Sequence, residues 1–232
     1  MDTFGIPHGM SWPCLENFST SDPLSQQLSE LWAPKRYFSQ LQEDSILHQS
    51  FFASPAWDCR NMTDGQRHGH CHPHLPTYLE LGANNGVSMS NTLFFEQSLG
   101  WQGLLIEGVR AHCESLKRDR CRGTAGNVIA CGGVCTADHG GQLTFVEMDA
   151  VSGAASMGTS QHHLNAWGKG RHAQTVKVPC APMSAIVARS GLSHRRFSLF
   201  SLDVEGGAST ACNTPLFPLN SSKRLSHGAC SD

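Results

Sequence analysis

The sequence has no marked excess of charge of either sign and no long apolar run. Its 17 Lys and Arg against 19 Asp and Glu give a formal net charge of -2 over 232 residues. This balance gives no electrostatic reason to expect nucleic acid or an anionic membrane as a partner. No stretch reaches the roughly 18 to 20 apolar residues of a membrane-spanning helix. The first residues also lack the basic start and apolar centre of a secretory signal. We therefore expect a soluble protein with one ordinary core.

Closely paired cysteines are absent, although the chain has 10 cysteines. They are scattered, and several lie in apolar runs such as VIACGGVC, where a reduced cysteine packs as a small hydrophobic side chain. These features predict reduced cysteines and a cytoplasmic protein. Three N-x-S/T sequons, at Asn17, Asn61 and Asn220, keep a secreted alternative open.

A histidine-rich segment, residues 58–76, precedes the regular part of the chain and is rich in turn-forming residues. Its alternating HxHCHxH pattern lacks the paired ligand spacing of a structural zinc site. We interpret it as a solvated loop and predict no metal site. A His-rich metal-binding or interaction module remains an alternative function. The candidate ligands for that alternative are Cys59, His68, His70, Cys71, His72 and His74.

The chain divides into three parts by composition. Residues 1–35 lack sustained periodicity and are predicted to be a poorly ordered leader. Residues 36–207 are predicted to form the domain, and residues 208–232 an irregular tail. The domain opens with a helix, because apolar residues of YFSQLQEDSILHQSFF mostly fit one helical face and Ser39 is available as a cap. The apolar positions are Phe38, Leu41, Ile46, Leu47 and Phe51.

Strands and helices then alternate. Residues 77–81, 103–109 and 126–135 are predicted strands, and residues 88–99 and 110–120 are predicted helices. Near-continuous apolar strands that alternate with helices predict an α/β domain with a parallel sheet covered on both faces.

An insertion follows the third strand. Residues 138–141 form a strong turn signal, QLTFVEM alternates like a half-exposed antiparallel strand, and SGAASMGTS is typical of a flexible loop. A short strand (TVKVPC), a helix that closes on Gly191 and a fourth main strand, residues 197–207, come next. The hairpin and loop are well placed to cover a site.

The stretch LELGANNG lies where the first strand turns into the next helix, which is where parallel α/β sheets bind ligands. Gly82 and Gly86 allow positive φ and a close approach of backbone to ligand. The spacing lacks the middle glycine of the G-x-G-x-x-G dinucleotide motif, which disfavours NAD. Glu107 ends the second strand, where a carboxylate can accept hydrogen bonds from both ribose hydroxyls. A nucleoside without pyrophosphate is the predicted ligand.

Three blocks, SQLQEDSIL, LELGANNGVSMSNTLFFEQSLGWQGLLIEG and FSLFSLDVEGG, resemble in sequence and order the signature blocks of the FkbM-type S-adenosylmethionine-dependent methyltransferases. The resemblance extends roughly from Tyr37 to Gly207. It implies a class I methyltransferase fold, which is Rossmann-like, and S-adenosylmethionine as cofactor. It also implies methyl transfer, usually to oxygen, so that the predicted partner is a small-molecule or glycan hydroxyl.

The same resemblance assigns the site residues. Asp203 and Glu205 match the motif after the fourth strand, where either could act as a base or orient the acceptor. On a purely structural interpretation, Asp203 caps nearby amides, Glu205 starts a loop and Glu80 only orients loop amides. The family positions on the cofactor side are Glu80, Gly82, Asn84, Gly86, Asn91 and Glu107. Less defined motif positions are Gln40, Glu43 and Asp44.

The sequence departs from the family pattern after residue 207. Residues 208–232 contain two prolines and many Ser, Asn and Gly, which argue against further helices or central strands. We therefore expect a C-terminally truncated domain whose sheet is incomplete after the fourth strand, with self-association through the exposed strand edge. A catalytically inactive remnant that keeps part of the cofactor site is the first alternative to an active enzyme, and the His-rich module is the second.

Overall fold

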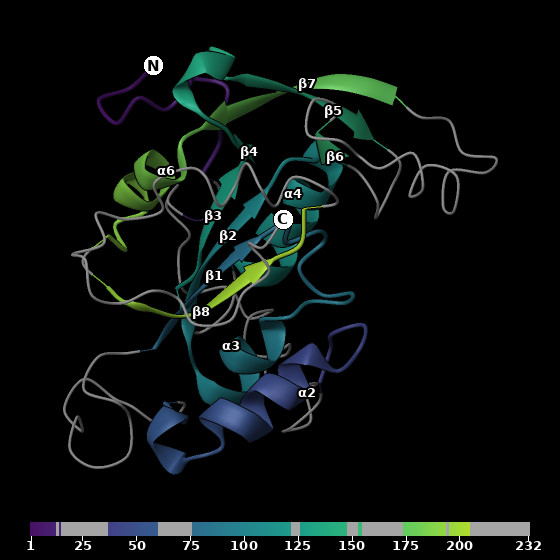
Figure 1. Ribbon diagram of the computed structural model, residues 1–232, viewed down its shortest axis with the longest axis vertical. Helices are drawn as coiled ribbons and strands as arrows, with labels where there is room; N and C mark the ends of the chain where they lie inside the picture. Colours follow the sequence, from purple (N-terminus) through teal and green to yellow (C-terminus); the bar gives the residue numbers. More distant parts are fainter. Residues whose placement is uncertain are drawn as a thin grey trace.

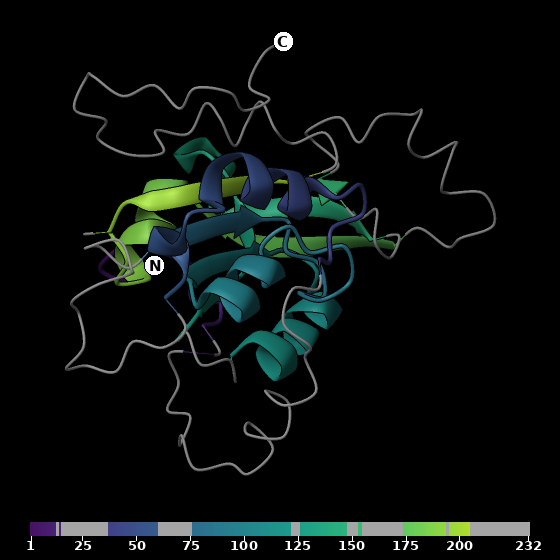
Figure 2. The same cartoon turned by 90° about the horizontal axis from the view of Figure 1, so that it is seen from below.

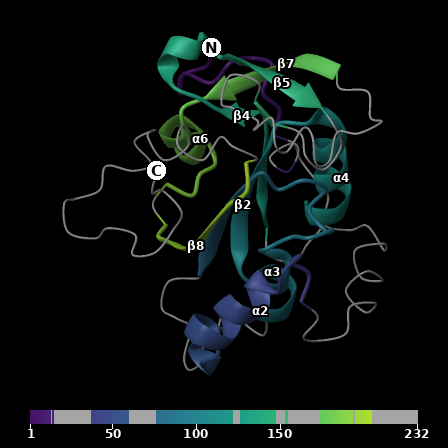
Figure 3. The same ribbon diagram turned by 45° about the vertical axis from the view of Figure 1, so that its right-hand side comes forward.

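The structure, a computed structural model, describes most of the predicted domain and the first residues of the chain. The described residues are 1–12, 14, 37–59, 76–121, 126–147, 153–154, 174–193 and 195–204. They form a central sheet with helices around it and a second sheet at one end (Figure 1). Figure 3 also places this second sheet, with β5 and β7, at the end of the molecule opposite α2.

The central sheet has four parallel strands in the order β3-β2-β1-β8 among the described residues. β1 lies inside the sheet, with Leu79 opposite Leu104 of β2 and Phe200 of β8. All five residues of β1 are buried, as expected of a parallel strand covered on both faces. The predicted α/β class is confirmed. The strands are β1 (Thr77–Leu81), β2 (Gln102–Glu107), β3 (Val128–Cys131) and β8 (Phe197–Leu202).

Each face of the sheet packs into its own apolar core. On one face, residues such as Leu79 and Leu104 contact α6 and the N-terminal segment. On the other, Tyr78 and Leu105 contact α3, α4 and Phe52, and Figure 2 shows α3 and α4 together on this side of the sheet. The alternation along each strand fixes which side chains meet which helices. These helices are α3 (Leu93–Leu99), α4 (Arg110–Arg120) and α6 (Met183–Arg189).

The second sheet contains the predicted insertion and has the order β4-β7-β5-β6. β5 runs antiparallel to β6 and β7, as the alternation of QLTFVEM predicts. The predicted third strand, residues 126–135, is split at Gly132, because β3 pairs with β2 while β4 pairs with β7. There is no room for a side chain at Gly132, because a Cβ there would overlap Met10 and the carbonyl of Pro179. The strands are β4 (Gly133–Val134), β5 (Gln142–Glu147), β6 (Gly153–Ala154) and β7 (Gln174–Ala181).

The first residues of the chain belong to the domain. Ile6, Met10 and Trp12 are buried against the core beside α6, and the Cys131 N–H donates to the Ser11 carbonyl over 2.9 Å. Residues 1–12 are thus packed on the sheet instead of forming a loose leader, because their apolar side chains cover one of its faces. Residues 13 and 15–36 lie outside the described part, as do residues 60–75 of the histidine-rich loop and 205–232 of the tail.

The helix predicted from Tyr37 onward starts later and is irregular. It consists of α2 (Glu43–Leu47) and a π-helical turn η1 (His48–Phe52), and no side chain caps α2. Leu41, Ile46 and Phe51 are exposed, so the predicted apolar face is partly wrong. Leu41 precedes α2, and Phe51 lies in the wider π turn, which shifts side chains off the 3.6-residue spacing. Single 3-10 turns occur at η2 (Pro55–Trp57) and η3 (Ala137–His139).

The prediction of reduced cysteines is wrong. Disulfides join Cys14 to Cys121, Cys113 to Cys131 and Cys135 to Cys180, and no cysteine of the described residues is free. Cys14 and Cys121 are separated by 107 positions, yet their Cα atoms lie 5.2 Å apart, within disulfide range. Cysteines that are isolated in the sequence can therefore still be neighbours in the folded protein. The cytoplasmic prediction therefore loses the observation on which it depended.

No described helix is both long and apolar enough to cross a membrane. In the described part of the chain, β8 pairs with β1 and with no strand on its other side. The predicted incomplete sheet and self-association depend on residues after Val204, which lie outside the described residues.

Candidate functional site

The glycine turn after β1 is shaped by protein packing. Gly82 has φ +83°, and its N–H donates to the Ile106 carbonyl over 3.0 Å. A Cβ at Gly82 would overlap the carbonyl oxygen of Asp203. Gly86 has φ +80°, and a Cβ there would lie 2.8 Å from Cγ of Arg120. Protein atoms thus occupy the space that the absent side chains leave, whereas the sequence pattern suggested that a ligand would occupy it.

Glu107 lies directly beside this turn. Its Oε2 accepts the Asn84 N–H over 2.7 Å, and its Oε1 accepts the Val109 N–H over 2.7 Å. Both contacts follow from the topology, because β1 and β2 are adjacent parallel strands that end at the same edge of the sheet. The structure therefore brings together the glycine turn and the carboxylate that sequence reasoning paired.

The Glu107 carboxyl has an unusual protonation equilibrium. Burial of the side chain, which is 6% exposed, raises its pKa to about 7. Backbone N–H groups, including those of Val109 and Asn84, oppose this rise, and the nearby Glu80 charge adds to it. A perturbed carboxyl at a strand end is a feature typical of functional sites.

We expect the free energy of unfolding to fall as pH rises from about 4.5 to about 7, by up to about 3 kcal/mol from Glu107. The folded state then binds more protons than the unfolded state, so its advantage is complete below the unfolded pKa and is lost as pH rises through the folded pKa. Urea unfolding of wild type and Glu107→Gln between pH 4.5 and 8 measures this. The difference between the two proteins removes the contribution of titratable groups that do not contact Glu107. A difference that stays constant with pH would contradict the shift.

Glu80 connects β1 to the start of α3. Its Oε1 accepts the Asn91 N–H over 3.2 Å and its Oε2 accepts the Thr92 hydroxyl over 2.6 Å. Asn91 in turn donates from Nδ2 to the Ser201 hydroxyl of β8 over 3.1 Å. Burial raises the pKa of Glu80, and the nearby Arg120 charge opposes the rise. Through these contacts, Glu80 and Asn91 hold the loop before α3 to the sheet.

The two predicted catalytic acids follow β8. Asp203 has an exposed side chain, and its N–H donates to the Leu81 carbonyl over 3.0 Å at the end of β1. The Asp203 backbone thereby lies against Gly82, next to the predicted cofactor turn. Glu205 lies outside the described residues.

The motif positions before β1 organise a turn. Asp44 is fully buried, and its carboxylate accepts the N–H groups of Phe38, Ser39 and Ser45. The Ser39 hydroxyl donates to the same carboxylate over 2.6 Å, so Ser39 supports this turn and does not cap a helix that begins nearby. Glu43 accepts the Leu41 N–H over 2.8 Å. No group of three or more His, Cys, Asp or Glu that could hold a metal occurs among the described residues.

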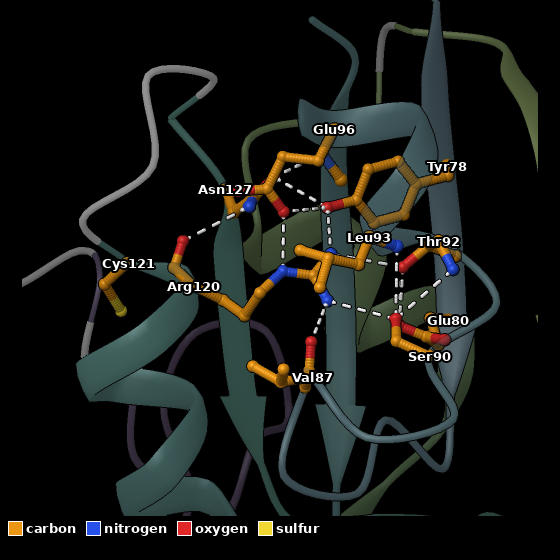
Figure 4. Close-up of polar contacts among 12 residues, drawn as sticks. Tyr78, Glu80, Val87, Ser90, Thr92, Leu93, Glu96, Arg120, Cys121 and Asn127 are labelled. Carbon is orange, nitrogen blue, oxygen red and sulfur yellow. Dashed lines mark hydrogen bonds and ion pairs between the residues drawn. The ribbon is translucent and has the colours of Figure 1, made fainter. Parts of the chain in front are cut away.

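A buried arginine, which sequence reasoning missed, lies under the glycine turn (Figure 4). Arg120 is fully buried, and its Nε donates to Glu96 over 2.5 Å. Its Nη1 donates to the Gly86 carbonyl over 2.6 Å, and its Nη2 donates to the Tyr78 hydroxyl over 2.8 Å. Further donations reach the hydroxyls of Ser90 and Thr92. The guanidinium therefore uses all five N–H groups and holds the turn to β1 and α3.

The remaining members of this network extend it to β3. The Tyr78 hydroxyl donates to Glu96 over 3.0 Å and lies 3.0 Å from the side-chain Oδ1 of Asn127. Asn127 also accepts the Gly103 N–H and donates to the Arg120 carbonyl. In the sequence, Arg120 has the appearance of an ordinary basic residue in the last turn of a helix, so no local signal marks it as buried.

The comparisons with known proteins agree with this geometry. Residues 80–214 match the family model of the methyltransferase FkbM domain, which covers more than half of the chain. The chain belongs to the FkbM methyltransferase family. This confirms the resemblance that the motifs indicated, and the match takes in every predicted cofactor and catalytic position from Glu80 to Glu205, while the SQLQEDSIL block precedes it. No curated protein and no solved structure matches the chain.

Proposed function

We propose that this FkbM-family domain binds S-adenosylmethionine at the ends of β1 and β2 and transfers its methyl group to a hydroxyl of a small molecule or glycan. The observation that carries the proposal is the Glu107 carboxylate beside the Asn84 amide. The two Glu107 oxygens accept the Asn84 and Val109 N–H groups separately, and a carboxylate has about four acceptor positions, which suits the two hydroxyls of a ribose. The acceptor atoms of Glu107 therefore suit the ribose of a nucleoside.

The residues of the chain have distinct proposed roles. Glu107 would hold the ribose, and the backbone of the turn from Gly82 to Gly86, fixed in part by the Asn84 N–H on Glu107, would lie against the rest of the cofactor. S-adenosylmethionine supplies a methyl group already activated by its sulfonium, so alignment of the acceptor is the main demand on the protein. Asp203, exposed beside this turn, would orient the acceptor hydroxyl and take its proton as the O–CH3 bond forms. Glu205 is the second proposed acid.

The disulfides bear on where this chemistry takes place. Disulfides persist in oxidising compartments and are rare in the cytoplasm. Three of them join elements of the described domain. We propose that the domain matures in an oxidising compartment, in keeping with the secreted alternative that the sequons left open.

Calorimetry with S-adenosylmethionine tests the proposed cofactor site. Glu107→Ala is expected to weaken binding by about 10- to 100-fold, because hydrogen bonds to a charged group contribute about 1.5 to 3 kcal/mol. Glu114→Ala is the matched control, because Glu114 is an exposed glutamate on α4, the helix that follows Glu107. This substitution should leave the affinity within about twofold of wild type.

Three outcomes separate the proposals. No heat of binding with wild type would contradict the cofactor proposal. Binding together with release of S-adenosylhomocysteine in the presence of hydroxyl acceptors would support the transferase. Binding without product across a broad acceptor panel would favour the inactive remnant.

A further inference from the structure

We propose that the Cys113–Cys131 disulfide is a positioning element for the Glu107 carboxylate, and that opening it weakens S-adenosylmethionine binding more than it weakens the fold. The inference rests on the proposed function, because it assigns Glu107 to the cofactor. It adds two residues, Cys113 and Cys131, to the machinery of that site.

The disulfide joins the two elements that flank Glu107, β3 and α4. Cys131 is the residue of β3 that pairs with Glu107 in the sheet register. Cys113 lies in the first turn of α4, the helix that follows Glu107 in the chain. The bond therefore fastens the end of β3 to the start of α4, across the segment that carries the carboxylate.

Hydrogen bonds carry this constraint to the carboxylate itself. The Cys113 N–H donates to the Val109 carbonyl over 3.0 Å, and the Val109 N–H donates to Glu107 Oε1 over 2.7 Å. On the other side, the Gly132 N–H, directly after Cys131, donates to the Glu107 carbonyl over 2.8 Å. Cys113 Sγ also lies 4.0 Å from this carbonyl oxygen. Both cysteines are thus one residue or one hydrogen bond from groups that bind Glu107.

The other contacts of Glu107 do not replace this constraint. Asn84, which binds the second carboxylate oxygen, belongs to the turn after β1. Phe145 of β5 lies where a side chain at Gly108 would be, so it packs on the segment without bonding it. With the disulfide open, the start of α4, which follows the short connection 108–109 from β2, would lose its cross-link to β3. A preorganised site loses affinity when such a tie is removed.

The chain supplies a matched control. Cys135–Cys180 joins the residue that follows β4 to β7 in the second sheet, where Cys180 pairs with Gly133. It closes 45 positions of sequence, against 18 for Cys113–Cys131. Because the stabilisation by a disulfide grows with the loop that it closes, removal of the control bond should destabilise the fold at least as much. Weaker binding by the 113/131 variant alone would then result from a displaced Glu107 carboxylate and not from a less stable fold.

The experiment compares S-adenosylmethionine binding by the oxidised wild type, Cys113→Ser/Cys131→Ser and Cys135→Ser/Cys180→Ser, with thermal unfolding of each protein. The 113/131 variant is expected to bind about tenfold more weakly or worse, and the 135/180 variant within about twofold of wild type. A second readout is the pH dependence of affinity. In the 113/131 variant its midpoint should move to lower pH, because a carboxyl released from its buried turn titrates closer to its ordinary range.

Equal affinity in all three proteins, or equal loss in both variants, would overturn the inference. A second pair, Cys113→Ala/Cys131→Val, keeps apolar volume at both positions in case the serine pair does not fold. Failure of both pairs to fold while the 135/180 variant folds would also overturn it, because the bond would then be a requirement of the whole fold. Absence of binding by the wild type would contradict the proposed function instead, so the two failures are distinguishable.

Discussion

Replacement of Arg120 by methionine is expected to lower the free energy of unfolding by about 3 to 5 kcal/mol, the usual result of removing one partner of a buried ion pair. Glu96 would remain buried with no cation, and the Gly86 carbonyl and Tyr78 hydroxyl would each lose a donor. Urea unfolding followed by far-UV circular dichroism at neutral pH measures the loss. Because Arg120 binds the turn, the variant should also bind S-adenosylmethionine poorly.

Arg118→Met provides the comparison for this prediction. Arg118 is two residues away on α4 and pairs with Asp119, but its side chain is 65% exposed whereas that of Arg120 is 0% exposed. Its loss should change the free energy of unfolding by less than about 1 kcal/mol. The double variant Arg120→Met/Glu96→Gln should recover part of the stability by removing the unpaired charge. Equal effects of Arg120→Met and Arg118→Met would show that the buried network contributes little.

Gly82→Ala is the second change with a large expected effect, a loss of about 2 to 5 kcal/mol from positive φ and steric overlap together. The new methyl group would overlap the Asp203 carbonyl, which is backbone and cannot swing aside. Relief requires the ends of β1 and β8 to separate, and their hydrogen bond from the Asp203 N–H to the Leu81 carbonyl would break. Thermal or urea unfolding measures the loss.

Gly191→Ala separates the two contributions. Gly191 has φ +74°, close to that of Gly82, but no atom lies within 4 Å of a Cβ built there. Its substitution should therefore cost only the strain of positive φ, about 1 to 2 kcal/mol. If both alanine variants lost the same stability, the contact between Gly82 and Asp203 would not be tight in solution.

Local patterns predicted the central sheet well. Residues 77–81 are a strand and residues 110–120 a helix within the predicted bounds, since apolar runs and helical spacing are properties of the neighbouring sequence. The pairing of the glycine turn with Glu107 was also predictable, because parallel strands end at one edge. By contrast, the division of residues 126–135 between two sheets depends on a distant strand, β7, and no local pattern reports it.

The parts that sequence reasoning missed are tertiary in origin. Burial of Arg120 requires acceptors from β1, α3 and the turn, which are assembled only in the fold. The disulfides require chain crossings that spacing does not reveal. The glycines were assigned to ligand approach on general grounds, while their neighbours prove to be Asp203, Leu116 and the arginine.

The N-terminal segment has a consequence for synthesis on the ribosome. Ser11 binds Cys131, and Cys14 is joined to Cys121, so the segment can take its place only after more than half of the polypeptide has emerged. During translation, Cys14 is exposed before its partner exists, and Cys59 is the next thiol to appear. Correct pairing in the finished protein therefore requires either delayed oxidation or an isomerase that exchanges early bonds.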